Sequence, residues 1–171
     1  MRRMSIDCGV PPVSRRCRKL TFTLYIMNRL TQASIIEFPK ICDPRGNLSF
    51  IEGSRHIPFP IKRVFYIYDV PGGETRGAHA HRQCAEVLVA VSGSLEVRLT
   101  DGERETTYLL NRSNRGLLIP PGSWRTMHEF TTGTVVLALC SREYEEEDYI
   151  RDFEEFVRFV ATQPEESRAK I

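Results

Sequence analysis

Between residues 61 and 140 the sequence is a series of short β-branched and aromatic runs, with no sustained helical periodicity. Clusters of Gly, Pro, Ser and Asp separate the runs, and Asp101-Gly102 is typical of a tight hairpin. Short runs divided in this way predict strands. The expected strands, in chain order, are 35–39, 48–52, 63–70, 85–91, 95–99, 106–110, 116–119 and 134–140. We therefore predict an all-β barrel or sandwich.

One amphipathic helix is expected after these strands, from Asp148 to about Val160. Apolar residues within it recur at spacings of three and four, which is the period of a helix with one buried face. Acidic residues 145–148 crowd its start, where carboxylates favour the positive end of the helix dipole. We expect a basic, disordered extension over 1–33, one domain over 34–161 and a flexible tail over 162–171.

Charge and cysteine content narrow the functional class. Residues 1–29 hold seven Lys or Arg and one acid, whereas the rest of the chain holds 17 basic and 21 acidic side chains. The expected domain is thus mildly acidic, which argues against nucleic-acid binding. The five cysteines are widely spaced and form no CxxC pair, as is typical of a reducing cytoplasm. No apolar run approaches the roughly 20 residues that span a bilayer.

The candidate catalytic or metal-binding residues lie between Gly73 and Gly93 and include His79, His81 and Glu86. In a strand, His79 and His81 point to the same side, so two imidazoles would converge on one pocket. A lone HxH pair is weak evidence, because exposed pairs are common on polar strand faces. Here, however, the spacing resembles the first cupin motif, G-x5-HxH-x3,4-E-x6-G, with every fixed position filled. This resemblance implies a cupin fold: a double-stranded β-helix, or jelly-roll barrel, here with a C-terminal helix.

The second cupin motif is degraded. Arg125 stands where the family has its last metal ligand, and a guanidinium, which stays protonated, cannot ligate a cation. His79, His81 and Glu86 could still form a two-histidine, one-carboxylate triad of the kind that holds iron. We expect no required metal.

A closer resemblance covers roughly residues 35–160. The run RVFYIYDVPGGETRGAHAHRQ, then LVAVSGS, RGLLIPPGSW and EEEDYIRDFEEF, resembles the sugar 3,4-ketoisomerases, also known as WxcM-like cupins. These act on dTDP-4-keto-6-deoxyglucose without a metal, and their histidines serve as acid and base. The family commonly has Gln at the position of Glu86, so this chain departs from the pattern by placing a carboxylate there.

The resemblance assigns roles to particular residues. His79 would be the base that handles the carbon-bound proton, His81 its partner, and Tyr66 the donor to the ketone oxygen. Arg76 would bind the diphosphate, since a guanidinium forks onto phosphate oxygens. The further substrate-binding residues expected are Tyr68, Glu86, Trp124 and Arg125. Because Tyr68 shares a strand face with Tyr66, the choice between the two tyrosines as the donor stays open.

The expected function is thus movement of a ketone from C4 to C3 of a dTDP-linked 4-keto-6-deoxy sugar in deoxysugar biosynthesis. Nothing is oxidised overall, so no cofactor is expected; what the reaction needs is a base with a pKa near neutrality and an oxyanion donor. Two alternatives stay open: a metal-dependent, oxygenase-like cupin using His79, His81 and Glu86, and a non-catalytic sugar-nucleotide-binding cupin. The cysteine pattern places the protein in the cytoplasm. The family resemblance further implies a homodimer, in which the apolar segment 35–39 could be a strand exchanged between subunits.

Overall fold

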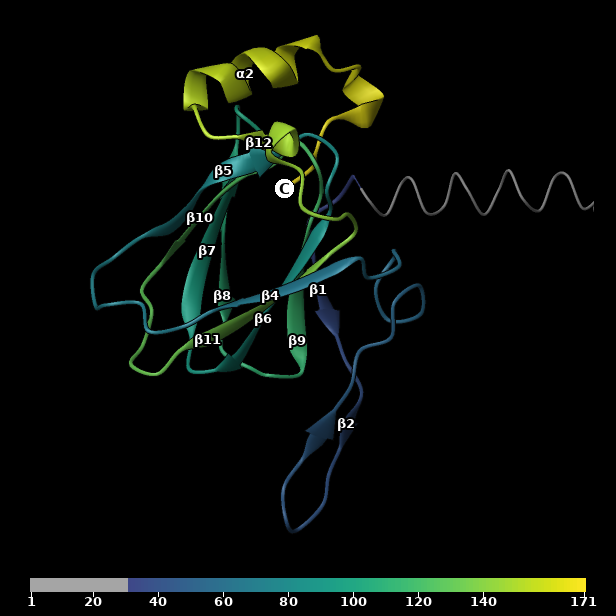
Figure 1. The fold of residues 1–171 in the computed structure, drawn as a ribbon, viewed down its shortest axis with the longest axis vertical. Helices are drawn as coiled ribbons and strands as arrows, with labels where there is room; N and C mark the ends of the chain where they lie inside the picture. Colours follow the sequence, from purple (N-terminus) through teal and green to yellow (C-terminus); the bar gives the residue numbers. More distant parts are fainter. Residues whose placement is uncertain (1–30) are drawn as a thin grey trace, which may run out of the picture.

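The computed structural model describes residues 31–171, and most of them form strands (Figure 1). One five-stranded sheet has the order β1 (Ser34–Glu37), β9 (Arg115–Ile119), β6 (Glu86–Ser92), β11 (Val135–Cys140) and β4 (Arg63–Ile67). The other has the order β12 (Tyr149–Ile150), β5 (Arg76–His81), β10 (Trp124–His128), β7 (Leu95–Thr100) and β8 (Glu105–Leu110). Neighbouring strands are antiparallel throughout both sheets. This confirms the all-β prediction and its C-terminal helix.

A separate ribbon of β2 (Lys40–Ile41) and β3 (Leu48–Ser49) projects away from the barrel (Figure 1). Its apolar side chains are unusually exposed: Ile41 and Leu48 retain more than half of their surface. Strand β1, before the ribbon, pairs with β9 of the same chain. The expected extension covers residues 1–33, and its first 30 residues lie outside the part of the chain that the structure describes.

The main core fills the space between the two sheets. Leu88 and Ala90 of β6 face Leu95, Val97 and Leu99 of β7 in one buried cluster. A second cluster covers the opposite face of the first sheet, where Val87 and Val89 pack under aromatic side chains of the loops around residues 38 and 59. Strand β6 is therefore buried on both faces, which explains why its sequence is apolar without alternation.

Helix α2 (Phe153–Thr162) begins five residues later than predicted. Asp152 caps it by accepting a hydrogen bond from the backbone N–H of Glu155 at 2.7 Å. The residues before it form a short 3-10 turn (Glu146–Asp148) and then β12, which pairs with β5 beside His81. The expectation of a helix from Asp148 was wrong, because Tyr149 and Ile150 extend a sheet edge instead of starting the helix.

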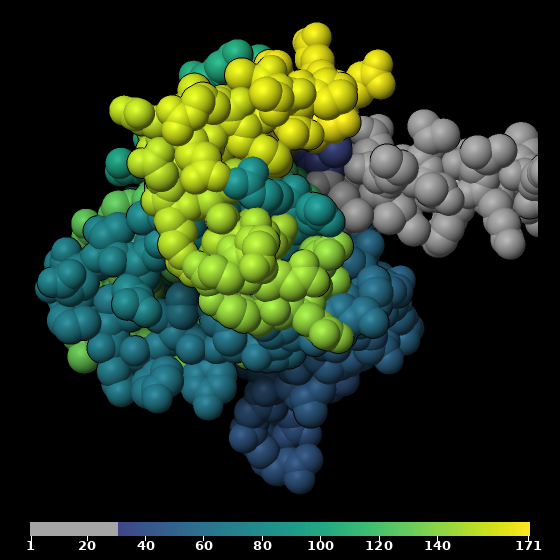
Figure 2. Space-filling view, turned by 45° about the horizontal axis from the view of Figure 1, so that its top comes forward, coloured from purple at the N-terminus to yellow at the C-terminus, as the bar shows by residue number. Residues whose placement is uncertain are grey.

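The predicted flexible tail folds back on the domain. Residues 165–167 form a second 3-10 turn, Ala169 is buried, and Lys170 exchanges backbone hydrogen bonds with Thr31 and Ala33. Figure 2 shows this C-terminal segment, in yellow, lying across the top of the barrel. Across residues 31–171, no helix is both long and apolar enough to cross a lipid bilayer.

Phe156 joins helix α2 to the second sheet. Its side chain is fully buried with Ala80 and Ile150, and its ring lies 5.6 Å from that of Trp124. We expect Phe156→Ala to lower the free energy of unfolding by about 3 to 5 kcal/mol, because it leaves a cavity that the sheet cannot fill. Phe153→Ala removes a ring that is 47% exposed, so it should lower the free energy of unfolding by clearly less. Urea unfolding followed by circular dichroism measures both; equal losses would contradict the buried role.

Candidate active site

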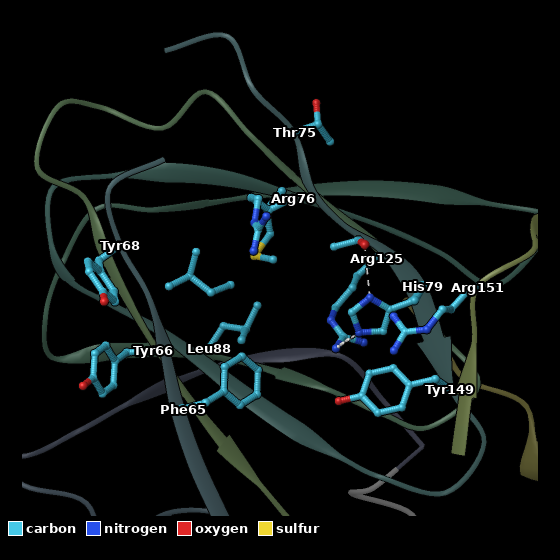
Figure 3. Close-up of a pocket in the computed structure, with 13 residues that line it drawn as sticks. Phe65, Tyr66, Tyr68, Thr75, Arg76, His79, Leu88, Arg125, Tyr149 and Arg151 are labelled. Atoms are coloured by element: carbon cyan, nitrogen blue, oxygen red, sulfur yellow. Dashed lines mark hydrogen bonds between the residues drawn. The ribbon is translucent and has the colours of Figure 1, made fainter. Parts of the chain in front are cut away.

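A cavity of about 560 Å³ opens between the two sheets at the end of the barrel where β5 and β12 meet (Figure 3). It is lined by Phe65, Tyr66, Ile67, Tyr68, Thr75, Arg76, Gly77, His79, Leu88, Arg125, Met127, Tyr149 and Arg151. Apolar side chains form its floor, and a few polar groups converge at one end, as in ordinary ligand sites. Of the predicted site residues, His79, Tyr66, Tyr68, Arg76 and Arg125 lie on its wall.

His79 is half-buried at the polar end of the cavity, on β5. Its Nδ1 lies 3.1 Å from the carbonyl oxygen of Gly77, and because a carbonyl only accepts, Nδ1 carries the ring proton. Next to it Ala78 has a left-handed backbone with φ of 55°, and the pairing of β5 with β10 slips there. This β-bulge sets the direction of the His79 ring, whose Nε2 lone pair faces Arg125.

The guanidinium of Arg125 is the centre of the polar cluster. Its Nη2 lies 2.7 Å from Oε2 of Glu86, 3.1 Å from Nε2 of His81 and within hydrogen-bonding distance of Nε2 of His79. One nitrogen of Arg125 thus sits among the three groups that were candidate metal ligands. These residues do not fit a metal at that point, because a permanent positive charge already occupies the position between them.

Charges around Arg125 shift the ionisation of its neighbours. Burial, followed by the positive charge of Arg125, lowers the pKa of His79 to about 3, so the imidazole is neutral at ordinary pH. Burial opposes ionisation of Glu86 as well, but Arg125 and a hydrogen bond from His81 outweigh it and lower the pKa of Glu86 to about 2. Glu86 is therefore a carboxylate, held in a buried ion pair.

His81 lies beneath His79 and is only 2% exposed, so it does not line the cavity. The two rings meet edge to face, with centroids 5.3 Å apart. Nδ1 of His81 lies 2.8 Å from Oδ2 of Asp148, and the same carboxylate accepts from the backbone N–H groups of Gln83 and Cys84. Asp148, interpreted from sequence as a helix-end charge, is in fact a buried partner that orients His81.

Tyr149 is a cavity residue that sequence reasoning missed. Its ring centroid lies 5.0 Å from that of His79 and 4.3 Å from that of His81, and its hydroxyl accepts from Arg63 Nη2 at 3.2 Å. Figure 3 shows this hydroxyl pointing into the cavity. The hydroxyl of Tyr66, by contrast, points away from His79, and that residue is 64% exposed. The block EEEDYIRDF carried the signal, but it was interpreted as a helix start.

The remaining predicted residues fall into two groups. Arg76 and Tyr68 line the main cavity and a neighbouring one of about 370 Å³, so they connect the two spaces. Trp124 lies outside the main cavity: its ring contacts Phe153 at 5.2 Å, edge to face, under helix α2. Its neighbour Arg125 points the opposite way, as successive residues in a strand do, which explains why only one of the pair reaches the cavity.

Known proteins share this architecture. Residues 31–161 match the FdtA family, described as WxcM-like, C-terminal. The TDP-4-oxo-6-deoxy-α-D-glucose-3,4-oxoisomerase of Aneurinibacillus thermoaerophilus is 43% identical over 127 residues, which are 74% of this chain and 91% of that protein.

Two solved structures are similar at comparable identity. A 3,4-ketoisomerase from Helicobacter canadensis is 43% identical with a TM-score of 0.74, over 75% of this chain and 97% of that one. A sugar 3,4-ketoisomerase from Thermoanaerobacterium thermosaccharolyticum, in complex with TDP, is 41% identical with a TM-score of 0.74, over 75% and 94%. Because the family model spans residues 31–161 and these relatives are 41–43% identical to this chain, the chain belongs to the WxcM-like family of cupin-type sugar 3,4-ketoisomerases.

Proposed function

We propose that this chain moves the keto group of a dTDP-linked 4-keto-6-deoxy-hexose from C4 to C3, as a step of deoxysugar biosynthesis. The observation that carries the proposal is a neutral imidazole, His79, that faces the cavity with a guanidinium beside it. The reaction needs a base and an oxyanion donor in one place, and this pair supplies both. The relative from Aneurinibacillus, named for this chemistry, supports the choice of substrate.

The isomerisation is a pair of proton transfers. A base removes the proton on C3 while the C4 carbonyl oxygen gains a proton, which gives an enediol. Loss of the proton from the C3 hydroxyl and delivery of a proton to C4 then complete a ketone at C3. Atoms and electrons balance within the sugar, so His79 can act alternately as base and acid.

Binding of the ketone would release the base. In the free protein Arg125 Nη2 donates to Nε2 of His79 and so occupies its lone pair. A ketone oxygen in the cavity competes for that donor, and Nη1 of Arg125 has no other hydrogen-bond partner among residues 31–171. Once Arg125 turns to the substrate oxygen, Nε2 of His79 is free to take the C3 proton. Substrate binding and activation of the base are therefore one event.

Tyr149 is our choice for the tyrosine that protonates or stabilises the sugar oxygen, in place of Tyr66. Arg63 holds its hydroxyl, and burial raises the pKa of this phenol, so it remains a proton donor. His81 acts as a positioning residue: clamped by Asp148, it supports the ring of His79 and the guanidinium of Arg125.

The nucleotide would lie at the other end of the cavity. Arg76 is exposed there, and in the described part of the chain it has no carboxylate partner, so its guanidinium is available for a diphosphate. The rings of Tyr66 and Tyr68 lie 5.6 Å apart on the same side, tilted by 36° to each other, and offer aromatic faces for the base. Trp124 has no place in this arrangement.

Deuterium exchange at the sugar ring tests the reaction. The full chain, treated with a chelator, should convert dTDP-4-keto-6-deoxyglucose in D2O to a 3-keto product carrying deuterium at C4, as followed by proton NMR. His79→Asn should abolish both exchange and product, because the base is lost. Binding of the nucleotide sugar without turnover would instead identify a non-catalytic binding protein, and turnover only after iron is added would favour the metal-dependent alternative.

A matched pair of variants separates the two tyrosines in the same assay. Tyr149→Phe should lower kcat by roughly 10²-fold or more, as loss of a positioned proton donor commonly does. Tyr66→Phe removes the same atom from an exposed ring and should leave kcat nearly unchanged. The reverse result would restore the original prediction for Tyr66.

The low pKa of His79 also makes stability depend on pH. An unfolded histidine binds a proton below about pH 6.5, whereas folded His79 resists protonation down to about pH 3. The unfolded state therefore gains protons first, and the fold loses stability as the pH falls from 6.5 towards 3. In His79→Asn the fall in Tm between pH 7 and pH 4.5 should be smaller. His128→Asn, outside the cavity, controls for loss of an imidazole; parallel curves for wild type and His79→Asn would refute the assignment.

We also propose a cytoplasmic homodimer. The free cysteines Cys42, Cys84 and Cys140, of which Cys42 is exposed, suit a reducing compartment. Ile41, Leu48 and Phe50, exposed on and after the projecting ribbon, form an apolar surface suited to a second copy. Light scattering should give twice the mass of one chain, and Leu48→Glu should shift the protein towards monomer. A monomeric wild type would overturn this proposal.

A further inference from the structure

Three buried side chains capable of ligating a metal meet behind the polar end of the cavity. Glu86 is the first residue of β6, and Cys84 lies two residues before it. Cys140 is the last residue of the neighbouring strand β11. One ligand atom of each lies within 4.8 Å of the others, and none of the three residues is more than 2% exposed. Two thiols and a carboxylate in one buried space form a donor set with affinity for zinc-like cations.

The two oxygens of Glu86 face different partners. Oε2 lies 2.7 Å from Arg125, on the cavity side. Oε1 lies 3.4 Å from Sγ of Cys140 and 3.2 Å from Nε2 of His81, on the far side. A cation bound through Oε1 would take the place of the proton that Cys140 shares with it, and the ion pair with Arg125 would remain.

Both sulfur atoms are placed to accept hydrogen bonds, as metal-bound thiolates do. Ser141 Oγ accepts from the backbone N–H of Ala85 at 2.8 Å, so its own proton is free for Sγ of Cys84 at 3.8 Å. Arg63 Nη2, which can only donate, lies 3.5 Å from Sγ of Cys140.

Arg63 also leaves a charge to be balanced. Its Nε and Nη1 are buried without a hydrogen-bond partner in residues 31–171, and in that range the guanidinium contacts the rings of Phe65 and Tyr144 but no carboxylate. Negative charge on the neighbouring sulfurs would compensate this guanidinium. Arg63 is therefore the outer partner expected of an anionic metal–thiolate group.

We propose that Cys84, Cys140 and Glu86 bind one thiophilic divalent cation of the Zn²⁺ type, separate from the position that Arg125 fills. On binding, each thiol loses its proton to solvent and forms a metal–sulfur bond, so two protons are released per ion. The ion ties β6 to β11 and stabilises the barrel. This inference does not depend on the proposed isomerase reaction.

Cobalt is the probe, because thiolate-bound Co²⁺ absorbs in the near ultraviolet and is displaced by Zn²⁺. The reduced full chain, without a polyhistidine tag, should develop this charge-transfer band on titration with Co²⁺ and lose it when Zn²⁺ is added. Zn²⁺ should also raise the Tm, since an ion that binds only the folded state stabilises it. A titration without any charge-transfer band would overturn the proposal.

Three cysteine variants locate the ion. Cys84→Ser and Cys140→Ser should each lose the band and the Tm shift, whereas Cys42→Ser, at an exposed thiol, should keep both. Cys8 and Cys17 are present in all three variants, so any binding there cancels in the comparison. Should a serine variant fail to fold, Cys84→Ala and Cys140→Ala replace it, and protection of wild-type thiols from a disulfide reagent by Zn²⁺ gives an independent readout. A band that only Cys42→Ser removes would place the ion elsewhere.

Discussion

The buried ion pair between Arg125 and Glu86 is the constraint on which the rest of the site depends. Each charge alone would be costly in this barrel, since a buried ion without a partner destabilises a fold by several kcal/mol. Together they fix one guanidinium nitrogen at the meeting point of two histidines. The pair thus turns a position that suits a metal ion into one that holds a hydrogen-bond donor, and burial together with the charge of Arg125 keeps His79 neutral.

Around this pair the fold is arranged in layers. Asp148 holds His81 by a hydrogen bond. The ring of His81 in turn lies against that of His79, whose side chain faces the cavity. The strand β12 carries Asp148's neighbour Tyr149 to the same place by pairing with β5. Rigid strands, not loops, therefore position the groups proposed for proton transfer, as a site that needs sub-ångström placement requires.

The sequence predicted the all-β fold and most of its strands because strand signals are local, but the expected strands did not include β5 and β10, which carry His79 and Arg125. Alternation in Leu95–Leu99 and the continuous apolar run of β6 both follow from which faces are buried. It predicted His79 and Arg125 through motif spacing. It failed at Asp148 and Tyr149, where helix-favouring charges precede a two-residue strand formed only because β5 offers an edge. It could not choose among the tyrosines either, because a strand's period of two identifies which residues share a face but not which face meets the cavity.

The backbone contacts between residues 31–33 and Lys170 have a consequence for engineering. They bring the two ends of the described domain side by side, with N···O separations of 2.7 Å from Ala33 to Lys170 and from Lys170 to Thr31. A linker of a few residues could join these ends, and new termini could be opened in the turn of the projecting ribbon, at the opposite end of the domain from β5 and β12 (Figure 1). A circularly permuted barrel of that design would keep every strand pairing that surrounds Arg125.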